Sequence, residues 1–219
     1  METYPTDAKN RIKRLPERGR YDLETIYQII DEALICQVAF IIDDQPYNIP
    51  ILHARRGNEL LLHGATSSRL IRHIEQGHPL SIAMTLVDGL VLAKAVFHHS
   101  INYRSVVLFG TGRVLVTDGE KIAALEHFTE KILPGRWQDA RPPNAKELKA
   151  TAVAVIDIEN ASAKVRSGPP KDDPEDAWMP VWSGVLPLET RLQTPQPVID
   201  SSAATSMPAY LAEFIKRNQ

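Results

Sequence analysis

Cysteine is nearly absent from this sequence, because Cys36 is the only one among 219 residues. A single thiol cannot form an intramolecular disulfide, so nothing in the chain requires an oxidising compartment. We therefore expect a reducing environment, of which the cytoplasm is the simplest. Cys36 stands among apolar residues, and this favours a buried, inert thiol.

The sequence also lacks long apolar runs and a strong net charge. No stretch of eighteen apolar residues occurs, so we expect no transmembrane helix. Residues 1–20 are polar and basic, without the apolar core of a signal peptide. The formal net charge is −2, which gives no field that would favour nucleic acid or an anionic membrane. We expect neither as a partner.

Several catalytic signatures are missing. No Gly-x-Gly-x-x-Gly follows a strand, which disfavours a doubly wound dinucleotide fold. The absence of Gly-x-Ser-x-Gly removes the usual hydrolase signature. There is no His-Glu-x-x-His and no cysteine pair for zinc. His98 and His99 are adjacent, and neighbouring strand residues face opposite sides, so they cannot easily share one ion. We expect no metal site.

What the sequence does contain is a series of strand signals. Dense β-branched and aromatic runs, separated by turn residues, cover 35–42, 47–54 and 59–63. Two tight turns between three such runs predict an antiparallel meander. Pro50 lies inside the second run, and it predicts an edge or a bulge because proline cannot donate to the ladder.

Further elements follow from the same reasoning. The pattern predicts a helix over 22–34 capped by Asp22, a short helix ending at Gly77, and a helix capped by Asp118. Apolar runs on both sides of Asp88-Gly89 predict a hairpin there. One long strand is expected from Tyr103 to Val116. The last long strand, or a pair of strands, is expected between 152 and 166.

About six antiparallel strands without strict βαβ alternation predict a mainly β protein, a barrel with peripheral helices. We divide the chain into a basic arm over 1–20, a barrel domain over 21–190, and a linker with a short helix over 191–219. The arm is either solvated, or it reaches a partner subunit or a bound phosphate. The apolar stretch 181–188 precedes the linker, and Met207 to Arg217 is expected to be helical.

The most informative stretch runs from Leu60 to Arg69. Its order is a strand, a tight turn, the hydroxyls of Ser67 and Ser68, the cation of Arg69, and a helix. Free backbone N–H groups, hydroxyls and a guanidinium would converge on one point, which suits a phosphate. The simpler alternative is a plain N-cap with a solvated arginine.

Two other stretches combine polar or aromatic groups. Polar side chains are dense from Phe97 to Val106, where they form either the mouth of a ligand site or a surface loop. Trp182 lies in an apolar segment beyond the strands. Its indole either closes over a flat ligand or packs in a core or interface.

Together these stretches resemble the pyridoxamine 5'-phosphate oxidase-related flavoproteins, especially their nitroimidazole-reductase-like branch. The resemblance spans residues 11–190 approximately. The matching residues are Tyr47-Asn48-Ile49-Pro50, Leu62-His63-Gly64-Ala65, Ser68-Arg69, Phe97-His98-His99-Ser100, Asn102-Tyr103-Arg104-Ser105-Val106, Lys164-Val165-Arg166, Gly168-Pro169-Pro170 and Trp182-Ser183-Gly184-Val185-Leu186-Pro187. Each motif is weak alone, and the number and order of the motifs make the set specific.

The resemblance implies a six-stranded antiparallel split β-barrel that forms a homodimer with FMN at the subunit interface. It places Pro50, Ile51 and Leu52 beside the flavin ring and Ser67, Ser68 and Arg69 at its phosphate. His63 would lie next to the flavin and serve as the catalytic residue. Arg104 and Ser105 match a cofactor-contacting strand, and Trp182 matches an aromatic residue that reaches the cofactor across the dimer.

The sequence departs from the family at two points. Ser68 replaces one of two phosphate-binding cations, and the only arginine soon after Trp182 is Arg191, at a poorly matching distance. Oxidation of pyridoxamine phosphate is therefore not expected. The favoured hypothesis is an FMN-dependent oxidoreductase acting with a small-molecule electron donor or acceptor. The alternatives are a non-catalytic flavin carrier or sensor, and a split barrel that holds haem, through His63, His98 or His99, or a deazaflavin.

Overall fold

The computed structural model describes residues 2–198 and 206–218. The protein is mainly β, as predicted, but ten strands are present in this part of the chain where six were expected. The additional strands are mostly short. The strands are β1 (Gly19–Arg20), β2 (Ile35–Ile42), β3 (Gln45–Arg56), β4 (Glu59–Ala65), β5 (Leu80–Leu92), β6 (Ser100–Gly110), β7 (Gly112–Val114), β8 (Thr151–Asp157), β9 (Asn160–Arg166) and β10 (Gly184–Pro187).

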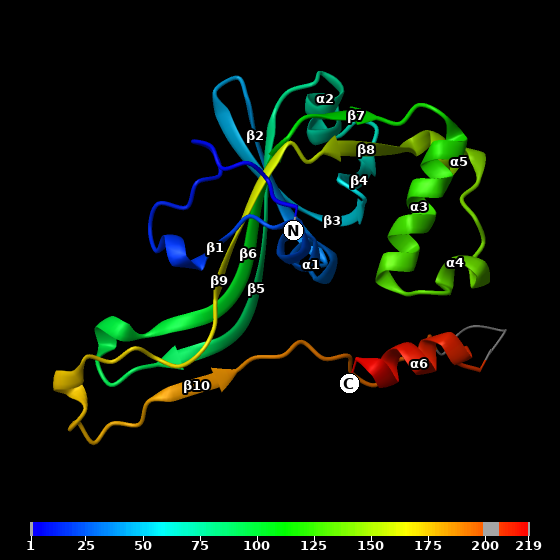
Figure 1. Ribbon diagram of the computed structural model, residues 1–219. Coiled ribbons are helices and arrows are strands. Elements are labelled where there is room, and N and C mark those ends of the chain that lie inside the picture. The colour runs from blue at the N-terminus through cyan, green and yellow to red at the C-terminus, as the bar shows by residue number, and fades with distance from the viewer. Residues whose placement is uncertain (1, 199–205, 219) are drawn as a thin grey trace.

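Helices lie around the sheet, most of them on one side of it (Figure 1). The α-helices are α1 (Leu23–Glu32), α2 (Arg69–Glu75), α3 (Asp118–Ile132), α4 (Arg136–Asp139), α5 (Ala145–Ala150) and α6 (Ala209–Arg217). Single 3-10 turns cover Pro16–Arg18, Val96–His98 and Pro174–Asp176. No helix among the described residues is both long and apolar enough to cross a membrane.

The strands pair in the order β1-β9-β6-β5-β2-β3-β4-β8-β7, with β10 added beside β5, and every pairing is antiparallel. The predicted meander of β2, β3 and β4 is confirmed. The long strand β3 changes partner along its length, because its first eight residues pair with β2 and its last four pair with β4. It therefore joins the two parts of the split sheet.

Two apolar clusters hold the sheet and helices together. The larger one fills the barrel and includes Ile26, Ile29 and Ile30 of α1, which are fully buried. Asp22 caps this helix as predicted, because its side chain accepts a hydrogen bond from the backbone N–H of Thr25. The smaller cluster joins α3 to β3, β4 and β8 through Phe128 and its apolar neighbours.

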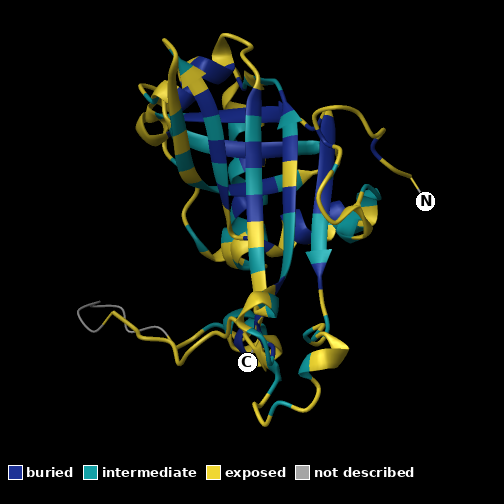
Figure 2. Cartoon of the chain, turned by 90° about the vertical axis from the view of Figure 1, so that its left-hand side faces the viewer, coloured by how far each residue is buried: buried dark blue, intermediate teal, exposed yellow. Residues whose placement is uncertain are grey.

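The predicted hairpin at Asp88-Gly89 is wrong, because β5 runs through these residues as one strand with a bulge. The chain turns later, around Val96–His98, so β5 and β6 form a long arm that extends from the barrel (Figure 1). A Cβ at Gly89 would lie 3.0 Å from the carbonyl oxygen of Leu186, so this glycine allows β10 to pair closely with β5. Figure 2 shows that exposed residues become common toward the arm.

The expected single strand from Tyr103 to Val116 is divided between the two parts of the sheet. β6 ends at Gly110 beside β9, and β7 begins at Gly112 beside β8. A Cβ at Gly110 would lie 2.0 Å from the carbonyl oxygen of Asp157, so only glycine fits this crossing. The next helix is capped by Thr117 in a capping box with Glu120, one residue before the predicted cap at Asp118.

The two terminal segments pack on different elements. The N-terminal segment lies against β9, where the buried side-chain amide of Asn10 donates to the carbonyl oxygen of Ala161 at 3.1 Å. The last helix is present as predicted, and its Tyr210 hydroxyl donates to Asp139 of α4 at 2.8 Å. The predicted linker includes residues 199–205, which lie outside the described residues.

Candidate functional site

A slot opens where β3 and β4 separate. The two strands pair only from His53–Leu62 to Arg56–Glu59. Beyond that point the preceding half of β3 stays with β2, while the end of β4 stays with β8. Among the described residues, the edge of β3 that faces away from β2 therefore has no strand partner over residues 45–52. Unpaired backbone groups on such an edge are available to a ligand.

Pro50, Ile51 and Leu52, for which the family resemblance predicts a place beside the cofactor, lie on this free edge. Pro50 is exposed, and it pairs opposite Gln37 of β2. Ile51 packs on the barrel core and Leu52 on the smaller apolar cluster with Phe128, so both sides of the strand are anchored. The edge is thus held rigidly in place.

His63 lies on β4, one residue beyond the last pairing with β3. Its ring meets the edge of the Phe128 ring with centroids 4.6 Å apart. Its Nδ1 atom is buried and has no hydrogen-bond partner among the described residues. Burial lowers the pKa of His63, so the imidazole is neutral at pH 7. A buried ring nitrogen without a partner is costly, and a ligand in the slot would relieve that cost.

Ser67, Ser68 and Arg69 follow β4 and begin α2. The Ser68 side chain makes no capping hydrogen bond in the described part of the chain. The backbone N–H groups of the first helical turn have no intrahelical partner. Arg69 is exposed and forms no ion pair within the described ranges. Its guanidinium lies over the ring of Tyr47, 4.7 Å from the centroid. Arg69 therefore stands beside Tyr47 of β3, and Ser67 and Ser68 directly precede it in the chain.

The structure does not bring the remaining predicted site residues to this slot within one chain. Arg104 and Ser105 lie on β6, and both β5 and β2 separate β6 from β3, a distance of about 14 Å at the usual strand spacing. Arg104 pairs with Glu32 and with Asp88, and these carboxylates raise its pKa. The Ser105 hydroxyl donates to a backbone carbonyl of β9.

Trp182 lies just before β10, on the arm, and its side chain is largely exposed. A Cβ at Gly184 would come within 2.9 Å of the indole, so the ring folds over this glycine.

The two histidines of the arm, His98 and His99, contact residues of the arm itself. His98 contacts Asp173 at 3.1 Å, and Nδ1 of His99 donates to the carbonyl oxygen of Ala95 at 3.1 Å. No group of three or more His, Cys, Asp or Glu that could hold a metal is present among residues 2–198 and 206–218.

A half-buried lysine lies behind the slot, and no sequence pattern identified it. The ammonium of Lys131 on α3 donates to the carbonyl oxygens of Ala33 at 2.8 Å and His53 at 3.0 Å. Burial lowers its pKa to about 8. His53 is fully buried, and Nε2 donates to the carbonyl oxygen of Ile30 at 2.8 Å. Burial, and then the Lys131 charge, lower the His53 pKa to about 4.

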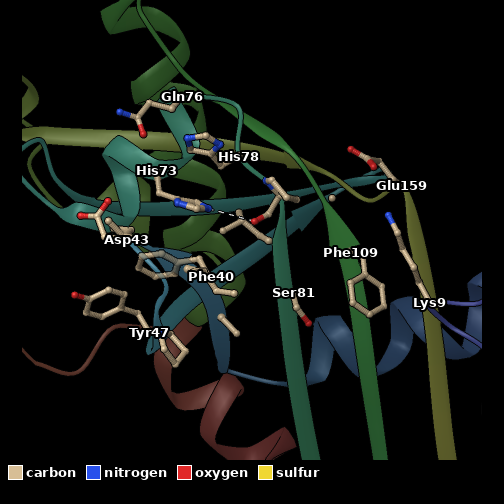
Figure 3. A pocket seen from close by; sticks show the side chains of 17 residues that line it. Lys9, Phe40, Asp43, Tyr47, His73, Gln76, His78, Ser81, Phe109 and Glu159 are labelled. Carbon is tan, nitrogen blue, oxygen red and sulfur yellow. Dashed lines mark hydrogen bonds between the residues drawn. The ribbon is translucent and has the colours of Figure 1, made fainter.

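A cavity of about 910 Å³ lies beyond the Arg69 end of the slot (Figure 3). Four aromatic rings follow one another along its wall. Tyr47 stacks on Phe40 with centroids 5.5 Å apart, Phe40 meets His73 at 4.9 Å, and His73 meets His78 at 5.0 Å. Of these residues only Tyr47 belongs to a motif identified in the sequence. The signal that was available is the i, i+4, i+7 spacing of Arg69, His73 and Gln76, which places the three residues, from the first residue of α2 to its C-cap, on one side of the helix.

The fold and the slot define a class, the split-barrel proteins with an open edge between two sheet parts. The sequence profile of the family "Pyridoxamine 5'-phosphate oxidase" matches residues 22–165. The chain belongs to this family. A comparison with curated proteins found no match.

Solved structures extend the likeness over almost the whole chain. The flavocytochrome Anf3 from Azotobacter vinelandii is 33% identical, with a TM-score of 0.89 and 97% of each chain covered. An FAD and haem binding protein from Mycobacterium smegmatis is 34% identical, with a TM-score of 0.84, covering 90% of this chain and 96% of that one. A proposed 5-nitroimidazole antibiotic resistance protein from Bacteroides thetaiotaomicron shares the fold at 20% identity, with a TM-score of 0.57, covering 67% and 86%.

Proposed function

We propose that this protein binds a flavin in the slot between β3 and β4 and acts as a flavin-dependent oxidoreductase. The observation that carries the proposal is the free edge of β3, which includes Pro50–Leu52 and whose Tyr47 lies under the Arg69 guanidinium at the start of α2. A flat ring with a phosphate tail needs a rigid edge at one end and convergent donors at the other. The two similar proteins named as a flavocytochrome and as an FAD and haem binding protein support this assignment.

The residues present fit a flavin by their donor chemistry. The orphaned Nδ1 of His63 and the backbone edge at Ile51 offer partners to a polar ring. Arg69 and the Ser67 and Ser68 hydroxyls would hold a phosphate, since a guanidinium fork and free N–H groups both suit an anion. FMN is the smallest ligand with both parts, and we propose it as the minimal cofactor.

The flavin would supply the hydride or electron transfer, and the protein would supply binding and orientation. His63 stays neutral at pH 7 because burial lowers its pKa, so it offers one N–H and one lone pair at the slot. It can therefore hold a proton at one ring nitrogen and orient a substrate with the other. Leu52 and Phe128 exclude water from one side of this position. A nitro compound or a quinone is a suitable class of acceptor.

We also propose a homodimer, in which the slot is completed by a second subunit. The outer face of the long strands exposes apolar side chains, among them Ile35, Ile41 and Val107, which are 45%, 62% and 36% exposed. Such a face favours association. Arg104, Ser105 and Trp182 would then approach the cofactor of the other subunit, which they do not reach within their own chain. Sedimentation of the purified protein at the mass of two chains is the expected result.

The test of the proposed function is the visible spectrum of the purified protein, followed by titration of the stripped protein with FMN. Flavin absorption bands, or saturable FMN binding, are expected. A colourless protein that shows no binding would contradict the proposal.

Steady-state oxidation of NADH or NADPH with quinone or nitro acceptors separates the enzyme from a non-catalytic carrier or sensor. Turnover that falls in His63→Ala while FMN stays bound favours the enzyme.

Haem is a second candidate, because both of the most extensively covered relatives described above are named for haem or cytochrome content. His63, with a buried and unpartnered Nδ1, is the histidine whose surroundings suit an axial ligand best. His98 and His99 lie at the tip of the arm and remain further possibilities across a dimer. A Soret band that disappears in His63→Ala but persists in His98→Ala and His99→Ala would establish this ligand.

A further inference from the structure

The N-terminal segment 9–20 forms a strongly basic surface that the flavin slot does not use. Six of its twelve residues are lysine or arginine, and only Glu17 is acidic. Five of the six cations are exposed, and none of the six forms an ion pair in the described part of the chain. Like charges held this close together favour an anionic partner. The six are Lys9, Arg11, Lys13, Arg14, Arg18 and Arg20.

The centre of this basic surface is fixed in a strained conformation. Leu15 has a φ of 55°, in the left-handed region that residues other than glycine rarely adopt, although the following Pro16 favours an extended backbone before it. The backbone N–H of Arg18 donates to the carbonyl oxygen of Leu15 at 3.0 Å, and the Lys164 ammonium donates to that of Arg14 at 2.9 Å. The Leu15 side chain is 38% exposed among the cations. An apolar group with a charged rim is typical of a protein–protein contact.

A surface of opposite charge lies at the far end of the arm that β5 and β6 form (Figure 1). The turn 171–178 contains four carboxylates and one lysine. Two of these carboxylates, Glu175 and Asp176, form no ion pair within the described ranges. Next to them Trp178 is 81% exposed. This turn therefore also combines an apolar side chain with unpaired charges, which are negative.

Within one chain the acidic turn does not contact the basic segment. Asp172 accepts a hydrogen bond from the backbone N–H of Lys94 at 2.7 Å, which ties the turn to the end of the arm. From Val106, which lies in the barrel core, to Ser100 at the start of β6, the arm rises by about 20 Å. No ion pair joins the turn to the basic segment in the described part of the chain. A second copy of the chain can bring the opposite charges together.

Resting on the homodimer of the proposed function, we propose that the basic segment 9–20 of each chain binds the acidic turn 171–178 of a second copy. The surfaces carry opposite charges, and each presents one exposed apolar side chain, Leu15 on one and Trp178 on the other. A two-fold axis would form this contact twice. Trp182 follows the turn by four residues, so the same contact would fix its position relative to the slot of the other chain.

The test exchanges charges between the two surfaces and measures the dissociation constant of the dimer by analytical ultracentrifugation. The acid-reversed chain carries Glu175→Lys and Asp176→Lys, and the base-reversed chain carries Lys13→Glu and Arg14→Glu. These side chains are exposed or half-buried, so the fold should survive. The measurement is made at low ionic strength, because salt screens exposed charges.

The matched control carries Lys146→Glu and Lys149→Glu, which reverse two exposed lysines of α5 that form no ion pair in the described part of the chain. We expect each of the two reversed chains to dimerise about ten- to a hundredfold more weakly than the wild type, because every lost pair is lost twice. The control should dimerise like the wild type. An equimolar mixture of the acid-reversed and base-reversed chains should recover the wild-type affinity, since both of its contacts again join opposite charges.

Reversed chains that dimerise as tightly as the wild type, or a mixture that stays as weak as its components, would overturn the arm contact and leave the homodimer intact. Anionic vesicles or single-stranded DNA that bind the wild type but not the base-reversed chain, with an unchanged dimer, would assign the segment to another partner. A wild type that sediments as one chain would remove the homodimer as well.

Discussion

The Lys131 ammonium lies 3.1 Å from Nε2 of His53, with the carbonyl oxygens of Ala33 and His53 as its nearest acceptors. This contact joins α3 to the end of α1 and to β3, immediately after Leu52 of the slot. His53 is neutral in the folded protein, because burial and the neighbouring ammonium both oppose a second positive charge. The slot is therefore supported by a buried histidine and a half-buried lysine whose charges depend on pH.

Acid should destabilise the protein through His53. Its folded pKa of about 4 lies below the usual value of 6.5, so between these values the unfolded chain binds a proton that the folded chain does not. Stability present above pH 6.5 is lost as the pH falls toward 4, by on the order of 3 kcal/mol. Urea unfolding at several pH values measures this. In His53→Asn the acid loss should be smaller, and an identical loss would exclude His53 as its source.

Lys131→Met should lower the free energy of unfolding by about 1–3 kcal/mol, because it removes the hydrogen bonds that the ammonium donates to the carbonyl oxygens of Ala33 and His53. Lys121→Met is the matched control on the same helix, since Lys121 makes only one long contact, 3.5 Å to the carbonyl oxygen of Leu148. Chemical denaturation of both variants gives the comparison. Equal stabilities of the two variants would show that the Lys131 contacts contribute nothing.

Arg104→Leu should destabilise the fold by about 1 kcal/mol, because Glu32 and Asp88 lose the cation between them. Arg72→Leu serves as the reference, since Arg72 is exposed on α2 and forms no ion pair in the described part of the chain. Thermal unfolding distinguishes the two. A variant that keeps its melting temperature but loses flavin would instead assign Arg104 to the cofactor of a neighbouring subunit.

The order of helices and strands could be predicted from the sequence, because the spacing of hydrophobic residues and the positions of turn residues depend on local structure. The meander of β2 to β4 and the cap at Asp22 follow from such signals. The Asp88-Gly89 dipeptide led to the wrong prediction of a hairpin for a physical reason. The same dipeptide suits a hairpin turn and a bulge, and only the tertiary pairing of β10 with β5 decides between them.

The candidate site was predictable where the sequence is contiguous and not where it is assembled by packing. Pro50–Leu52, His63 and Ser67–Arg69 come from the consecutive elements β3, β4 and the start of α2, so the motif order predicts that they lie near one another. Lys131 and His53 are 78 residues apart, and nothing in their neighbourhoods marks them as a pair. The cavity combines α2 with β2, β5 and β6, and its shape depends on the point where β2 departs from β5.

Protonation of His63 should determine how the turnover rate of the protein falls at low pH. Burial places its pKa below the usual value of 6.5, so it remains neutral at pH 6.5 and gains a proton only below that value. The rate of NADH oxidation with a quinone should therefore hold from pH 8 to about 6.5 and decline at lower pH. His63→Ala should lower the rate and remove this decline while flavin stays bound. An unchanged profile in the variant would exclude His63 from the reaction.

The most direct measurement is a titration of stripped wild type, Arg69→Met and Arg72→Met with FMN and with riboflavin. Arg69 and Arg72 lie three residues apart on α2, and only Arg69 stands at the slot, over Tyr47. A charged hydrogen bond to phosphate corresponds to about 1.5–3 kcal/mol, or roughly ten- to a hundredfold in affinity. We predict that Arg69→Met weakens FMN by this factor and leaves riboflavin unchanged, and that Arg72→Met changes neither. An FMN affinity that is unchanged in Arg69→Met, or no FMN binding by the wild type, would contradict the binding of a flavin phosphate at the start of α2.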